Sequence, residues 1–167
     1  MQLHSDKKPS GILQISATKT HAEINWDQVN KALAWNLDGP ISFLVKRENH
    51  KLEVVEQMAL EYRRFLGIIA AYPNDRFPIS EAVDELWHTH ILFTRDYRAM
   101  SDEIRGEYIN HDPILTLEQK RAVEPYYYKG TLVRYHELYR EAAPRYWWPI
   151  EEGAICWSGY TIVPISN

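Results

Sequence analysis

Apolar residues recur every three or four positions along most of the chain, a spacing typical of one face of an α-helix. The first helix is predicted to begin after Asn25, an N-cap with Gln28 three residues on, and to end at the turn residues 37–40. A longer helix is predicted over about residues 51–72, where two prolines follow. Its charged positions fall away from the apolar face: Glu61, Arg63 and Arg64.

A third helix is predicted over about residues 81–101, with Ser80 as its N-cap. Its apolar positions cover most of the helix circumference, which indicates a buried central helix. A fourth helix is predicted over about residues 117–139, with a kink or a split at Pro125. The apolar positions of the third helix are Val83, Leu86, Trp87, Ile91, Leu92, Phe93 and Tyr97.

The two ends of the chain differ from this helical middle. Residues 1–22 are polar and are predicted to form an N-terminal arm, followed by a helical domain over residues 23–149. Proline, glycine and aromatic residues favour an irregular C-terminal tail over residues 150–167 that packs on the domain. The predicted fold is therefore all-α: a compact bundle of four to five helices with an irregular, aromatic-rich C-terminal tail.

Length and charge narrow the range of functions. The chain has 167 residues, which suits one domain with its own core, and a formal net charge of −4 with a pI of about 6.0. This balance offers no basic surface for nucleic acid or for an anionic membrane. We therefore expect neither as a partner.

The apolar runs and the cysteine content bear on location. The longest apolar run, residues 65–72, is far shorter than the ~20 residues that cross a bilayer. The N-terminal stretch lacks the apolar core of a signal peptide. A single cysteine, Cys156, excludes an intramolecular disulfide and fits a reducing compartment. We expect a soluble, cytoplasmic protein.

The stretch DELWHTH, residues 84–90, holds the candidate chemistry. Asp84 and His88 are four residues apart, so on a helix they share one face. His111 follows the helix closely enough to fold back beside them as a third ligand. Two histidines and one carboxylate suit zinc or non-haem iron, with positions left open for water.

The second histidine of this stretch has a different place on a helix. His90 points roughly 200° away from His88 on a helix of 3.6 residues per turn. We expect it in the core as a hydrogen-bonding group, or else in support of the metal ligands. In an extended strand, residues two apart share a side, and both histidines could then be ligands with His111. The helical flanks disfavour the strand.

A purely structural role accounts for the same residues. Asp84 and His88 can form an ordinary i,i+4 hydrogen-bonded pair, and His111 can belong to a turn that ends in Asp-Pro. The neighbouring aromatic residues Trp87 and Tyr97 are candidate binding residues. Zinc or iron is the cofactor expected if a metal binds.

Several motifs resemble one known family: REN at 47–49, YRRFL at 62–66, PxSxxVDELWHTHILFTRDY at 78–97, and GxxxxHDP at 106–113. Together with TLVRYHELY…WWP they make residues 40–149 similar to the glycine-rich domain-containing protein-like family. The resemblance implies a mostly helical domain in which Trp87, His88, His90 and His111 are the marked positions, with Asp84 ahead of them. It implies no particular activity. The chain has seven glycines and lacks the glycine-rich region of the plant members.

Two functions follow as hypotheses. The first is a helical domain that binds a protein partner or acts as an accessory protein and carries a His/Asp metal site. The alternative is a small zinc- or iron-dependent enzyme that uses a metal-bound water as its nucleophile. The residues leave open whether the protein is an enzyme.

Overall fold

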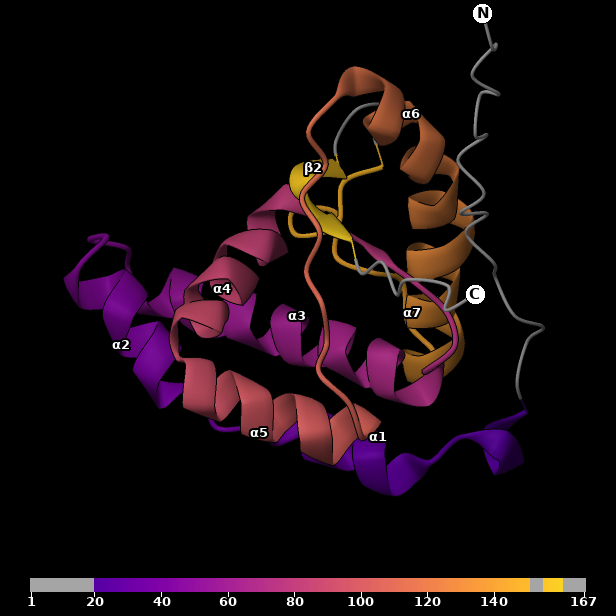
Figure 1. Cartoon of the computed structure of the whole chain (residues 1–167), viewed down its shortest axis with the longest axis horizontal. Coiled ribbons are helices and arrows are strands. Elements are labelled where there is room, and N and C mark those ends of the chain that lie inside the picture. The colour runs from indigo at the N-terminus through magenta and orange to yellow at the C-terminus, as the bar shows by residue number, and fades with distance from the viewer. Residues whose placement is uncertain (1–19, 151–154, 161–167) are drawn as a thin grey trace, which may run out of the picture.

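A computed structural model describes residues 20–150 and 155–160 of the chain (Figure 1). Helices dominate these residues, so the predicted all-α class is confirmed. Besides the α-helices there are a short 3-10 helix at His21–Glu23, η1, and a π-helical turn at Tyr127–Thr131, η2. The α-helices among the described residues are α1 (Trp26–Leu33), α2 (Asp38–Lys46), α3 (Leu52–Ala71), α4 (Glu81–Leu92), α5 (Thr94–Arg105), α6 (Leu117–Tyr126) and α7 (Leu132–Tyr139).

The central element is α3, whose bounds match the predicted helix within one residue at each end. It crosses the middle of the molecule, with α1 and α5 along one side, α4 on the other and α7 at its C-terminal end (Figure 1). Its side chains Tyr62 and Phe65 are fully buried. Full burial of one such aromatic side chain contributes roughly 1.5–3 kcal/mol to folding.

The predicted helix over residues 81–101 is wrong in one respect, because it is broken into α4 and α5. The break lies at Phe93, whose backbone leaves the helical region with ψ of 59°. The N–H of Phe93 donates to the carbonyl of His90, and α5 then starts in a new direction. Contacts between α4 and α5 stabilise this turn, among them a 2.8 Å bond between His90 and Asp96. On a continuous helix these two residues would lie on different faces.

Helix α2 was not predicted, because the residues Asp38-Gly39-Pro40 resemble a helix end. They form its first turn instead. The backbone N–H groups of a first turn have no partner within the helix, so the missing N–H of Pro40 costs nothing there. The predicted interruption near Pro125 is confirmed, since α6 passes into the π-helical turn η2 directly after it.

The prediction of an irregular C-terminal tail is wrong over Ile155–Tyr160, which form strand β2. This strand pairs antiparallel with β1 (Pro78–Ser80), which precedes α4. Because the two paired segments are far apart in the sequence, neither segment by itself shows a periodic pattern that reveals the pairing. The remaining tail residues 151–154 and 161–167 lie outside the described residues, as does most of the predicted N-terminal arm.

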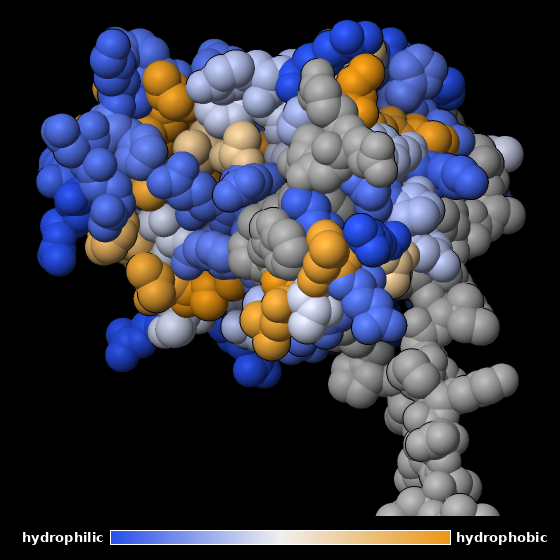
Figure 2. Space-filling model, turned by 90° about the horizontal axis from the view of Figure 1, so that it is seen from above, coloured by the Kyte–Doolittle hydropathy of each residue, from blue (hydrophilic) through white to orange (hydrophobic). Residues whose placement is uncertain are grey.

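The face of the molecule seen in Figure 2 is mainly hydrophilic. Figure 2 shows apolar residues as separate small groups among polar and charged ones. None of the helices in the described part of the chain is long and apolar enough to cross a membrane.

Candidate metal centre

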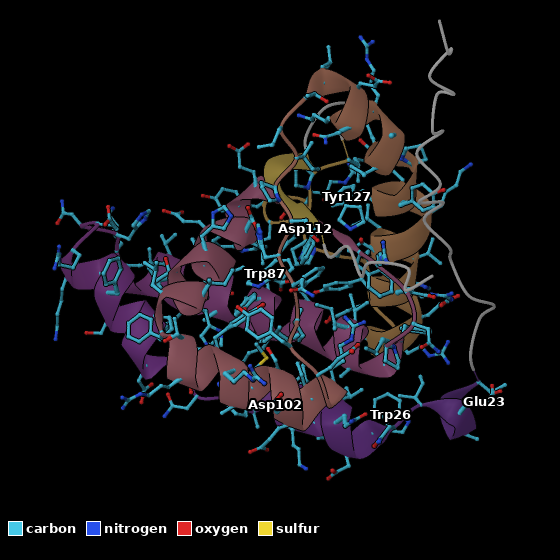
Figure 3. The ribbon with its side chains drawn as sticks, in the orientation of Figure 1. Glu23, Trp26, Trp87, Asp102, Asp112 and Tyr127 are labelled. Atoms are coloured by element: carbon cyan, nitrogen blue, oxygen red, sulfur yellow. The ribbon has the colours of Figure 1, made fainter. Side chains whose placement is uncertain are left out.

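The three predicted ligands come from two elements. Asp84 lies in the first turn of α4 and His88 one turn later, so helical geometry alone brings them together. His111 lies on the segment between α5 and α6, which crosses in front of α3 and runs beside the first turn of α4 (Figure 1). Figure 3 marks the sequence neighbours of the histidines, Trp87 on α4 and Asp112 on this segment.

The carboxylate of Asp84 joins the two histidines. Its Oδ1 lies 2.8 Å from Nε2 of His111, and its Oδ2 lies 3.3 Å from Nε2 of His88. The two imidazole rings are 4.5 Å apart between centroids. One possible ligand atom from each residue lies within 4.8 Å of the other two. Atoms that bind one tetrahedral zinc ion are about 3.4 Å apart, given bond lengths of ~2.1 Å, so the three groups lie near the spacing that a metal ion requires.

The centre is buried at the carboxylate and open at one histidine. The side chain of Asp84 is 1% exposed and that of His111 is 7% exposed, whereas that of His88 is 47% exposed. A buried carboxylate requires compensation by positive charge or by hydrogen bonds. The Nε2–H of His111 supplies a hydrogen bond, Nε2 of His88 lies close to the other carboxylate oxygen, and a metal ion between these groups would supply charge.

The candidate binding residues Trp87 and Tyr97 are both buried. The indole ring of Trp87 stands edge-on against the ring of His111, with 4.3 Å between centroids. Its Nε1–H donates to the hydroxyl of Tyr97 at 2.8 Å, and that hydroxyl donates to the carbonyl of Ile109 at 2.7 Å. Burial raises the pKa of Tyr97, so its hydroxyl keeps the proton that it donates.

The structure does not bring His90 to this centre. Because residues 81–92 are helical, His90 points away from His88, and the extended alternative is wrong. Its Nε2 lies 2.8 Å from Oδ2 of Asp96, and its Nδ1 lies 3.1 Å from the hydroxyl of Tyr62. A carboxylate only accepts, so Nε2 carries the proton and Nδ1 accepts from Tyr62. Burial lowers the pKa of His90, against the opposing effect of Asp96.

A second buried carboxylate was missed by the sequence analysis. Glu61 was placed away from the apolar face of its helix, yet it is buried. It accepts from the hydroxyl of Tyr135 at 2.9 Å and from the indole N–H of Trp148 at 2.7 Å, and it pairs with Arg64 at 3.2 Å. These contacts join α3 to α7 and to the segment after it. No local signal marks Glu61 as buried, because Tyr135 and Trp148, which cover it, are distant in the sequence.

Comparison with known proteins adds a family. Residues 34–126, more than half of the chain, match the family described as UCP032817-like. No curated protein and no solved structure matches the chain. The match does not carry the glycine-rich domain-containing name, which stays a resemblance. All three residues of the candidate centre lie in the matched range, and the chain belongs to the UCP032817-like family.

Proposed function

We propose that the domain binds one divalent transition-metal ion, zinc or iron(II), through Asp84, His88 and His111. The observation that carries the proposal is the Asp84 carboxylate, which lies 2.8 and 3.3 Å from the Nε2 atoms of two histidines. Zinc and non-haem iron both use two histidines with one carboxylate.

The burial of Asp84 and His111 supports a binding site over an ordinary surface pair. A fully exposed ion pair contributes little to stability, with a typical value of about 0–1 kcal/mol. Here the carboxylate is buried and each of its oxygens faces a different histidine, so the ligand atoms already converge. A metal ion needs both Nε2 atoms without their protons, so binding releases protons.

The exposed edge at His88 leaves room for a further ligand. A protein partner is our first choice for what covers it, because Leu92 lies one turn further along the same face of α4 and is 65% exposed. An apolar side chain beside an open metal edge suits a partner that contributes both an apolar contact and a ligand atom. The domain would then act as an accessory protein, and its metal ion would hold in place the surface of α4 that the partner contacts.

Catalysis by a metal-bound water is the alternative. The same open edge supports it, since a catalytic zinc or iron site keeps at least one coordination position for water. The observation that separates the two uses is turnover: a hydrolase or oxygenase activity that depends on the metal would favour the enzyme. A stable complex that is lost in the Leu92→Glu variant while metal is retained would favour the accessory protein.

Metal content tests the proposal directly. The protein is purified without a His-tag, incubated with zinc or, without oxygen, with iron(II), desalted, and measured by elemental mass spectrometry. We expect about one equivalent in the wild type and none in His88→Ala or His111→Ala. His136→Ala is the matched control, because His136 is an exposed histidine on α7, away from the cluster. Equal metal in all four proteins, or none in a folded wild type, would refute the proposal.

A further inference from the structure

The candidate centre depends on a residue that regular secondary structure does not hold. Asp84 and His88 are fixed by α4, but His111 follows the end of α5 at Arg105 and precedes α6. Gly106 ends α5 with a positive φ of 82°, and the chain from there to residue 116 has no helix. Apart from a bridge residue at Asp112, this segment has no regular secondary structure, so the position of His111 against Asp84 depends on contacts with other parts of the chain.

A chain of two buried hydrogen bonds reaches this segment. Trp87 donates its indole N–H to the hydroxyl of Tyr97, and Tyr97 donates its single hydroxyl proton to the carbonyl of Ile109. Ile109 is fully buried and lies two residues before His111. The chain therefore ties the backbone beside the loop ligand to the helix that carries the other two ligands.

The break between α4 and α5 makes this chain possible. On one continuous helix, Trp87 and Tyr97 would be about 15 Å apart along the axis, at 1.5 Å per residue. Because the helix turns at Phe93, their polar atoms meet at 2.8 Å instead.

Trp87 also contacts the ligand itself. Its ring stands at 72° to the ring of His111 with 4.3 Å between centroids, on the side chain that carries the bond to Asp84. An edge-to-face contact of this kind restricts rotation of the imidazole. The hydrogen-bond chain from Trp87 to the carbonyl of Ile109 and the ring contact of Trp87 thus act on the same histidine, His111.

We infer that Tyr97 and Trp87 are positioning residues for His111, and that they hold its Nε2 atom toward Asp84. The inference deepens the proposed metal site and rests on it for the affinity that it predicts. Groups that orient metal ligands without touching the metal typically change affinity by 10- to 100-fold when they are mutated.

The Tyr97→Phe variant tests the inference, and Tyr62→Phe is its matched control. Both tyrosines are buried, and each substitution removes one hydroxyl that bonds to a residue of α4, to His90 for Tyr62 and to Trp87 for Tyr97, which also donates to Ile109. The hydroxyl of Tyr62 bonds to His90, which is not a proposed ligand, and does not bond to the described segment that carries His111. In competition with a chelating indicator we expect Tyr97→Phe to bind zinc roughly 10- to 100-fold more weakly than the wild type. We expect Tyr62→Phe to bind zinc as the wild type does, even where thermal unfolding shows both variants equally destabilised.

Amide hydrogen exchange without metal is the second measurement. We expect faster exchange in Tyr97→Phe over residues 107–112, and wild-type exchange there in Tyr62→Phe. Wild-type exchange in Tyr97→Phe would overturn the inference, whether or not the protein binds metal. Equal zinc affinity of the two variants would overturn it as well. A folded wild type that binds no zinc would instead refute the proposed function, and loop exchange alone would then decide the role of Tyr97.

Discussion

Helix α4 carries a histidine–carboxylate cluster on each of two sides, and the two clusters have opposite burial. On one side the carboxylate of Asp84 is 1% exposed and His88 is 47% exposed. On the other side His90 is 0% exposed and its partner Asp96 is 42% exposed. In the first pair the carboxylate is the buried side chain, and in the second pair the histidine is the buried side chain.

This difference separates a candidate binding site from a structural contact. Both ring nitrogens of His90 already have partners, Asp96 and Tyr62, and burial keeps the ring neutral by lowering its pKa. Such a histidine has no atom left for a ligand. Asp84 is a buried negative group between two histidines, and the burial of an acid favours a bound cation. Two histidines that are two residues apart thus have different partners and different exposure.

The largest expected effect is on zinc binding and comes from replacing the carboxylate of each cluster by an amide. Asp84→Asn should abolish zinc binding, because a neutral amide is a poor zinc ligand and no longer compensates the ion. Asp96→Asn should bind zinc as the wild type does, since its carbonyl oxygen can still accept from His90. Isothermal titration with zinc measures both. Retained binding in Asp84→Asn would mean that the comparison between the clusters does not hold.

The next effect is on stability without metal. His90→Phe keeps an aromatic ring but leaves the buried hydroxyl of Tyr62 without its partner, which should lower the free energy of unfolding by about 1–3 kcal/mol. His88→Phe should lower it by about 1 kcal/mol or less, because His88 is half-exposed and Asp84 keeps His111. Urea unfolding in the presence of a chelator measures both variants. A larger loss in His88→Phe would reverse the assignment of roles.

The smallest effect is the dependence of stability on pH. Folding lowers the pKa of His90 below its ordinary value of 6.5, so the unfolded chain binds a proton more readily than the folded one. The stabilising contribution of neutral His90 is complete above the unfolded pKa and is lost as the pH falls through 6.5 toward the folded pKa. The slope from one group is at most about 1.4 kcal/mol per pH unit.

The difference in unfolding free energy between the wild type and His90→Phe, measured at several pH values, isolates this contribution. It should shrink between pH 7.5 and pH 5.5, because only the wild type has to protonate the buried ring on unfolding. A difference that stays constant with pH would show that His90 takes up its proton equally in both states.

Parts of the fold were open to prediction because they depend on local geometry. The apolar period of residues 51–72 predicts α3, and the kink at Pro125 follows from the missing N–H of proline. Other parts were not. Helix α2 begins with residues that resemble a helix end, and strand β2 is defined by its pairing with β1. A pattern of residues within one segment does not specify which distant segment will pair or pack with it.

The candidate site divides in the same way. That Asp84 and His88 share a face and that His90 points away is determined by the sequence, since 3.6 residues per turn holds for any α-helix. Tertiary structure alone decided that the helix turns at Phe93 and that His111 returns to Asp84 from 27 residues away. It also decided that Glu61 is buried against Trp148, 87 residues further on. The physical reason is range: a helix is specified by bonds between residues three or four apart, whereas burial and ligand geometry depend on contacts that only the folded chain makes.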